Sequence, residues 1–202
     1  LVSATFVNQA GATMAIETGN LFLERGSALS GVVTVAQGSA LRLGGTHVWQ
    51  DLDASQGGGR VALQGAVVTA TGINRLGTLT ITSPANLHAS DRLVVRRLEL
   101  HNNDATMTGP AQVDLDTLDW RGGWLLNAGT TTVHGLATIS TGNNVVQGSS
   151  VVLKGETRWT GGTILVGGNG SIGNDGSFRD LTSGDGLIAF PFVPGSTTFT
   201  NT

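Results

Sequence analysis

Three aspartates stand close together in the segment DLDTLDW, at Asp114, Asp116 and Asp119. Alternation along a β-strand places Asp114 and Asp116 on one side, and we expect that side to face outward because Val113 and Leu115 occupy the other. Paired carboxylates supply the acid and the base in glycosidases, and polysaccharide lyases need similar groups. The pair therefore raises the hypothesis of an enzyme that acts on polysaccharide along a lateral face.

Such a site would also need a cation or an imidazole one or two coils away. Arg96, Arg97 and His134 are the residues placed approximately for that role. A solvated outer face accounts for the same carboxylates without any chemistry. We therefore predict no catalytic residue, and we keep Asp114 and Asp116 as candidates for surface binding.

Two of the four tryptophans, Trp120 and Trp159, are 39 residues apart and begin the similar segments WRGGWLLNAGTTTV and WTGGTILVGGNGSI. Large aromatic side chains bury well in a stacked column, so we expect both in or near the interior. Trp124 is the better candidate for exposure. It joins the two aspartates as a candidate for contact with a sugar.

Cofactor and metal motifs are weak. The segment GNGSIG at 168–173 matches the dinucleotide fingerprint, but the following NDGSFRDLTSGDG cannot form the helix whose N-terminus would hold a pyrophosphate. The four histidines have no short metal spacing, and the chain has no cysteine. We predict a turn at this motif, no cofactor and no metal.

The composition excludes several classes of protein. The chain has 202 residues, a net charge of −3, 31 glycines, 12% charged residues and 39% hydrophobic residues. Collagen needs glycine at every third position, a disordered chain needs more charge, and a membrane-spanning helix needs about 20 consecutive apolar residues. No basic stripe is present to follow a nucleic-acid backbone. We therefore expect neither nucleic-acid binding nor membrane insertion by this segment.

Apolar residues recur at intervals of 19 or 20 residues. One such column is Val67, Leu87, Met107, Leu126, Val146 and Leu165, and another is Leu21, Leu41, Val61, Ile81, Leu100 and Trp120. Turn residues keep the same interval at Gly26, Gly45, Gly65, Pro84, Asn103, Gly123, Gly142 and Gly162, and again at Gly109, Gly129, Gly148 and Gly168. Short β-branched runs lie between these turns, and helix patterns are almost absent.

Coils of this length with three short strands each are what a parallel β-helix needs, because each strand pairs with its equivalent one coil away. The sequence predicts an all-β fold, a right-handed parallel β-helix (solenoid) of about ten coils of roughly 20 residues. We expect residues 1–202 to form a single β-solenoid segment of a longer array, with flanking repeats as neighbours. The glycine-poor coil Ser90–Asp104 departs from the glycine-rich repeat pattern of the other coils. We therefore expect it to be less regular, and we expect it to be the place to seek a specific function.

Three phrases, at residues 30–49, 118–133 and 157–178, resemble the degenerate repeats of large bacterial secreted β-helical proteins. These include autotransporter passengers and filamentous-haemagglutinin-like adhesins. The resemblance implies a non-catalytic stalk, spacer or adhesive surface, placed outside the cell or on the bacterial surface. It implies a glycan or a host or neighbour-cell surface protein as partner. The polysaccharide-degrading enzyme, and an oligomeric fibre or tail-spike-like segment, stay open as alternatives.

Overall fold

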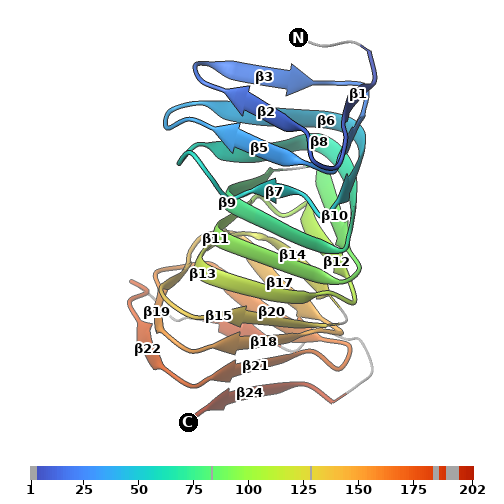
Figure 1. Ribbon diagram of the computed structural model, residues 1–202. Coiled ribbons are helices and arrows are strands. Elements are labelled where there is room, and N and C mark those ends of the chain that lie inside the picture. Colours follow the sequence, from blue (N-terminus) through green and yellow to red (C-terminus); the bar gives the residue numbers. More distant parts are fainter. Residues whose placement is uncertain (1–3, 83, 128, 184–186, 190–195) are drawn as a thin grey trace.

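The computed structural model describes residues 4–82, 84–127, 129–183, 187–189 and 196–202. The 24 strands in these ranges belong to one hydrogen-bonded system, and every pairing between strands is parallel. They wind into a right-handed β-helix of about nine turns (Figure 1). The predicted fold class is confirmed. No helix in the described ranges has the length and hydropathy needed to cross a membrane.

Each turn has three sides, which we call faces 1, 2 and 3. Face 1 consists of β1 (Phe6–Asn8), β4 (Ser27–Leu29), the later parts of β6 (Ala40–Gln50) and β8 (Arg60–Thr71), β10 (Ala85–Ala89), β12 (Ala105–Gly109), β14 (Gly123–Asn127), β17 (Asn143–Gln147), β20 (Thr163–Gly167) and β23 (Leu187–Ala189). Face 2 consists of β2 (Thr13–Ile16), β5 (Val32–Val35), β7 (Asp53–Ala54), the earlier parts of β9 (Ile73–Thr82), β11 (Arg92–His101) and β13 (Gln112–Arg121), β15 (Thr130–Val133), β18 (Ser150–Leu153), β21 (Ser171–Asn174) and β24 (Thr198–Asn201). Face 3 consists of β3 (Asn20–Leu23), the earlier parts of β6 and β8, the later parts of β9, β11 and β13, β16 (Ala137–Ile139), β19 (Glu156–Trp159) and β22 (Ser177–Asp180).

Five strands are longer than predicted because they continue around a corner. β6 and β8 pass from face 3 to face 1, and β9, β11 and β13 pass from face 2 to face 3. The number of turns is also one below the expected ten. Coil length explains this in part, since the last coil takes 27 residues to bring Thr198 beside Ser171.

The interior is a stack of apolar side chains from successive coils. One inward column on face 3 consists of Leu23, Leu43, Leu63, Ile81, Leu100, Trp120, Ile139 and Trp159. Trp120 and Trp159 are 1% and 3% exposed, which confirms their predicted burial. The predicted column through Val67 has the right period but mixes two neighbouring positions. Leu87, Met107 and Val146 are buried as expected, whereas Val68 is buried where Val67, 53% exposed, was expected.

Both series of turn residues lie at corners, as predicted. The first series, from Gly26 to Gly162, marks the corner where face 3 leads into face 1, and the second marks the corner where face 1 leads into face 2. Gly45 shows why glycine is needed there. Its φ is +81°, and a Cβ at this position would collide with the backbone oxygen of Glu24 in the preceding coil.

The coil Ser90–Asp104 is not irregular, contrary to expectation. Its strand β11 is in register with β9 and with β13 at residues 92–95 and again at 97–101. Tight glycine corners are absent because the strand turns gently at Arg96 instead of stopping. One continuous strand in this coil therefore presents outward side chains on face 2 and, beyond Arg96, on face 3.

Candidate functional site

Asp114 lies on face 2 and points outward, as predicted. Its carboxylate accepts hydrogen bonds from Arg92 Nε and Nη2 at 3.1 and 3.0 Å, and His134 Nε2 lies 3.5 Å from Oδ1. Only 14% of the side chain is exposed. Arg92 is its partner because it is paired in register with Gln112, the residue two positions before Asp114. The carboxylate is largely enclosed by these neighbours.

Asp116 is exposed and also points outward, but it does not share a face with Asp114. The strand β13 turns at this residue, since residues 113–115 pair with β15 and residues 118–120 pair with β16. Its carbonyl accepts a hydrogen bond from the backbone of Gly135 at 2.8 Å, which ties the corner to the next coil. The two candidate carboxylates are therefore divided by a corner of the solenoid.

Trp124, in β14 on face 1, is half-buried and not fully exposed. It is paired in register with Thr106 on one side and Val145 on the other. Its neighbours are therefore uncharged, and it lies on a different face from all three aspartates.

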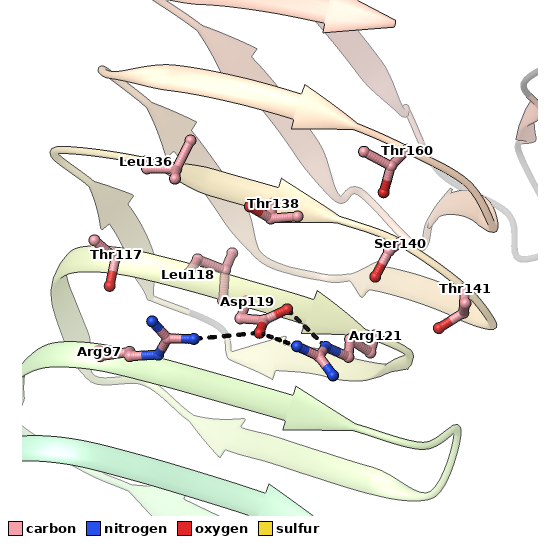
Figure 2. Close-up of a pocket in the computed structure, with 10 residues that line it drawn as sticks. All are labelled: Arg97, Thr117, Leu118, Asp119, Arg121, Leu136, Thr138, Ser140, Thr141 and Thr160. Atoms are coloured by element: carbon pink, nitrogen blue, oxygen red, sulfur yellow. Dashed lines mark hydrogen bonds and ion pairs between the residues drawn. The ribbon is translucent and has the colours of Figure 1, made fainter. Parts of the chain in front are cut away.

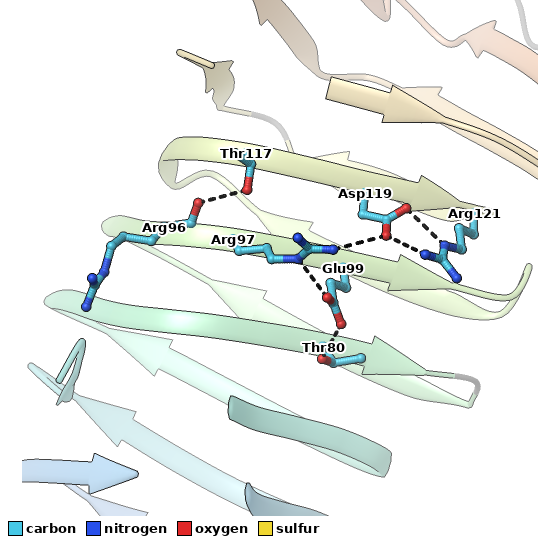
Figure 3. A network of polar contacts seen from close by, with 7 residues as sticks. All are labelled: Thr80, Arg96, Arg97, Glu99, Thr117, Asp119 and Arg121. Carbon is cyan, nitrogen blue, oxygen red and sulfur yellow. Dashed lines mark hydrogen bonds and ion pairs between the residues drawn. The ribbon is translucent and has the colours of Figure 1, made fainter. Parts of the chain in front are cut away.

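A network of charged residues lies on face 3 (Figure 3). Asp119 accepts hydrogen bonds from Arg121 Nε at 3.0 Å and Nη2 at 2.7 Å, a bidentate arrangement. Arg97 donates to Glu99 at 2.7 Å and to Asp119 at 3.4 Å, so it joins two coils. Glu99 in turn accepts from the hydroxyl of Thr80 at 2.9 Å. The bond to Asp119 raises the pKa of Arg121 and keeps its guanidinium charged.

A further ion pair continues this pattern toward the C-terminal end of face 3. Arg158 donates to both oxygens of Glu156 at 3.0 Å, and Arg179 lies 3.5 Å from the same carboxylate. Arg158 lowers the pKa of Glu156 through these bonds. Opposite charges two residues apart thus recur along this face.

A hollow of about 470 Å³ opens beside the network (Figure 2). Its lining is made of guanidinium groups, one carboxylate, hydroxyls and two leucines: Arg97, Thr117, Leu118, Asp119, Arg121, Leu136, Thr138, Ser140, Thr141 and Thr160. Figure 2 shows Asp119 and Arg121 on one coil, Arg97 on the coil before it, and the hydroxyls of Thr138, Ser140 and Thr160 on the coils that follow. The hollow can therefore donate and accept hydrogen bonds along the solenoid axis.

A second hollow, of about 350 Å³, lies on the opposite side of Arg97. It is lined by Gly38, Ser39, Gly58, Gly59, Arg60, Thr78, Arg97 and Glu99. Because Arg97 lines both hollows, they lie next to each other, and together we call them the face 3 groove. The arginines that line it are Arg60, Arg97 and Arg121.

Arg97 and Asp119 could both be picked out from the sequence, but the ion pair between them was not predicted. The sequence suggests Arg97 as a partner for Asp114, whereas the structure places Arg97 on face 3 beside Asp119. The signal that would have revealed the groove is the recurring pair of opposite charges at i and i+2, in Arg97–Glu99, Asp119–Arg121 and Glu156–Arg158. Such spacing puts both charges on the same side of a strand.

A buried polar pair on face 1 was not predicted at all. The hydroxyl of Ser27 lies 2.8 Å from His47 Nδ1, and His47 Nε2 lies 2.7 Å from the carbonyl oxygen of Gly44. Ser27 is 5% exposed and His47 is fully buried. Burial lowers the pKa of His47. A serine–histidine pair resembles a nucleophile and its base, but its place in the core leaves no room for a substrate, so we assign it a structural role.

No cluster of three or more histidine, aspartate or glutamate side chains able to hold a metal occurs among the residues that the structure describes. Comparisons with protein-family models, curated proteins and solved structures found no match to this chain. Any function must therefore be argued from the fold and from the chemistry of its faces.

Proposed function

We propose that this chain is a non-catalytic module of a secreted or surface-displayed bacterial protein, which serves as a rigid stalk and presents a binding face. The observation that carries the proposal is the unbroken parallel ladder of about nine turns. Every turn is held to the next by three sets of backbone hydrogen bonds and by a continuous apolar column. At about 4.8 Å for each turn, the stack is about 43 Å long. A structure of this kind resists bending and separates what lies at its two ends.

The stalk role is tested by measuring the distance between the two ends in solution. The chain has no cysteine, so Gly11→Cys and Asp175→Cys give two specific labelling sites near opposite ends of the stack. Fluorescence energy transfer between dyes at these sites should give one narrow distance distribution near about 40 Å. A broad distribution would contradict a rigid stalk. A pair of labels within one coil, at Gly11 and Gly19, serves as the control for dye motion.

The absence of catalysis is tested with a panel of neutral and acidic polysaccharides. The proposal expects retention of at least one polymer on the immobilised chain, without new reducing ends or unsaturated sugar products. Release of such products, lost in the double variant Asp114→Ala and Asp116→Ala, would contradict it. Glu17→Ala, at an exposed residue far along the chain from both aspartates, is the control variant.

The polysaccharide-degrading enzyme is the second candidate, favoured by one contact. His134 Nε2 lies 3.5 Å from Asp114 Oδ1, and Arg92 holds the same carboxylate. An imidazole, a carboxylate and a guanidinium are together the kinds of group such chemistry uses. The cleavage assay above decides between this candidate and the stalk. A mass measurement in solution tests the remaining alternative, an oligomeric fibre, which requires a trimer or a larger assembly.

A further inference from the structure

The charges of this protein are distributed unevenly over its three faces. Face 3 carries six of the ten arginines, at Arg42, Arg60, Arg97, Arg121, Arg158 and Arg179, and four carboxylates, at Glu99, Glu156, Asp119 and Asp180. The chain as a whole has a net charge of −3. Face 3 is thus a locally positive surface on an acidic protein, and a positive groove concentrates anions near it.

Exposure makes the face 3 groove more positive than a count of its charges suggests. The side chains of Arg97 and Arg121 are 51% and 52% exposed, whereas those of Glu99 and Asp119 are 16% and 11% exposed. The carboxylates therefore lie beneath the guanidinium groups that they hold in place. A ligand approaching the groove meets N–H donors in fixed positions, and an arginine held in this way loses little freedom on binding.

Arg60 is the third cation of the groove, and it lies in line with Arg97. It is paired in register with Thr78, which is paired with Arg97, so the two arginines occupy the same outward column two coils apart. Their backbones are then separated by about 9.6 Å, twice the spacing between strands. Among the described residues Arg60 has no ion-pair partner, so its guanidinium is available to a ligand. This repeat is close to the length of one disaccharide in an extended polysaccharide.

The rest of the lining consists of small and hydroxyl-bearing residues. Thr117, Thr138, Ser140 and Thr160 line one hollow, and Ser39 and Thr78 line the other. Hydroxyls both donate and accept hydrogen bonds, which suits the hydroxyls of a sugar. Gly38 and Gly58 carry no side chain, and no atom lies closer than 3.8 Å to the place a Cβ would take, so a ligand can approach the backbone closely there. No aromatic residue lines either hollow, so charge and hydrogen bonds must supply the affinity.

We infer that the face 3 groove binds an extended acidic polysaccharide, whose carboxylates are bound by Arg60, Arg97 and Arg121 and whose hydroxyls contact the neighbouring threonines and serines. This inference rests on the proposed function, since it names the ligand of the binding face. In an extended polyuronate, alternate sugars turn their carboxylates to the same side, so carboxylates on that side recur once per disaccharide and match the spacing of Arg60 and Arg97. A nucleic-acid duplex has a higher density of charge, so the net negative charge of the rest of the protein opposes it more strongly than it opposes a polysaccharide with one carboxylate per sugar.

The test is calorimetric titration of the whole chain with hexagalacturonate, a short polyuronate, at low salt. Arg97→Gln should weaken binding about ten-fold, because it removes a charge-assisted contact at the centre of the groove. Arg60→Gln should weaken it several-fold. Arg97→Lys should fall between Arg97→Gln and the unaltered chain, because lysine keeps the charge but loses the planar fork. Arg75→Gln, an exposed arginine on face 2, is the matched control and should leave binding unchanged.

Folding is monitored separately, because Arg97→Gln leaves Glu99 and Asp119 with fewer partners. Arg60→Gln breaks no ion pair among the described residues, so a loss of binding in that variant cannot come from unfolding of the network. Affinity should fall as salt is added, since exposed charges carry the interaction.

Three results would overturn the inference. Hexagalacturonate fails to bind, or binds equally well to the unaltered chain and to both the Arg97→Gln and Arg60→Gln variants. A neutral hexasaccharide binds as tightly as the acidic one. An oligoglutamate or an oligonucleotide binds with equal affinity and the same dependence on Arg97, which would assign the groove to another class of polyanion. None of these results bears on the rigidity or the cleavage assay, so failure of the inference is distinguishable from failure of the proposed function.

Discussion

Faces 1 and 3 are built on the same ladder and the same apolar interior, yet their outer surfaces have almost nothing in common. The strands of face 1 contain no aspartate, glutamate, lysine or arginine, and exposed valines such as Val7, Val48 and Val67 lie on them. The strands of face 3 carry ten charged residues. The inward positions of the two faces hold the same kind of side chain, whereas the outward positions hold different kinds. In this protein, the fold depends on one half of each strand's residues, and the other half is free to take on a specific binding role.

The sharpest way to test this division is to change two adjacent residues of one strand. In β11, Leu100 is fully buried in the face 3 column and Glu99 points outward next to it. Leu100→Ala should lower the free energy of unfolding by about 2–5 kcal/mol, because it leaves a cavity between two neighbouring coils. Glu99→Gln should lower it by less than about 1 kcal/mol. Urea denaturation of both variants measures the two effects, and equal effects would contradict the division of labour between the two sides of the strand.

The corner where the two faces meet should be nearly as sensitive. Gly45→Ala should lower the free energy of unfolding by about 1–3 kcal/mol, because alanine disfavours the observed φ of +81° and its Cβ would collide with the oxygen of Glu24. Gly11→Ala is the matched control, with a similar φ of +80° and nothing within 4 Å of the added Cβ. Denaturation should show a smaller loss in the control. Equal losses in the two variants would mean that the collision with Glu24 adds nothing to the destabilisation caused by the strained φ.

The free energy of unfolding should depend on pH through a buried residue of face 1, His47, and not through the residues on its surface. Burial lowers the pKa of His47, so the unfolded chain takes up a proton at a higher pH than the folded chain does. The resulting stability is fully present above the unfolded value of 6.5 and is lost as pH falls through that value toward the lowered pKa of the folded state. The free energy of unfolding should therefore be lower at pH 5.5 than at pH 7.5.

The source of that pH dependence is identified by two variants on the same face. His47→Gln should remove most of the difference between the two pH values, whereas His88→Gln, at an exposed outward position, should leave it unchanged. Chemical denaturation at each pH gives the measurement. A difference that survives in His47→Gln would place its origin elsewhere.

The ion pairs of face 3 should contribute least to stability, since they are arranged on the surface. Arg121 is 52% exposed where it meets Asp119, and exposed pairs of this kind stabilise by about 0.2–1 kcal/mol. A double-mutant cycle of Asp119→Asn and Arg121→Gln should give a coupling energy in that range, falling further in high salt. A coupling of several kcal/mol would mean that the network supports the fold, and the contrast between inward and outward positions would then be lost on this face.

The sequence allowed prediction of the repeat and the corners because both depend on local chemistry. Glycine at positive φ marks a turn whatever lies in the next coil, so the series from Gly26 to Gly162 was correctly assigned to turns. The phase of the inward columns was less certain, since two valines in succession, Val67 and Val68, do not indicate which of them points inward. Only the pairing with β6 and β10 settles that choice.

The face 3 groove could not be predicted for the same reason, because it depends on register between coils. Asp119 and Arg97 are 22 residues apart and meet only because Glu99 is paired with Asp119. The separation of Asp114 from Asp116 also escaped prediction, since a strand that bends without glycine has no marker in the sequence. The coil Ser90–Asp104, in which we expected a specific function, supplies both Arg97 and Glu99, and that function stays a prediction.

The continuous parallel ladder has a mechanical consequence. Its hydrogen bonds run along the axis of the solenoid, so a force that pulls the two ends apart acts on the terminal coil first and leaves the others loaded but intact. Each detached coil of about 20 residues would release roughly 60–70 Å of chain. Under tension the protein would lengthen in discrete steps of this size, one coil at a time.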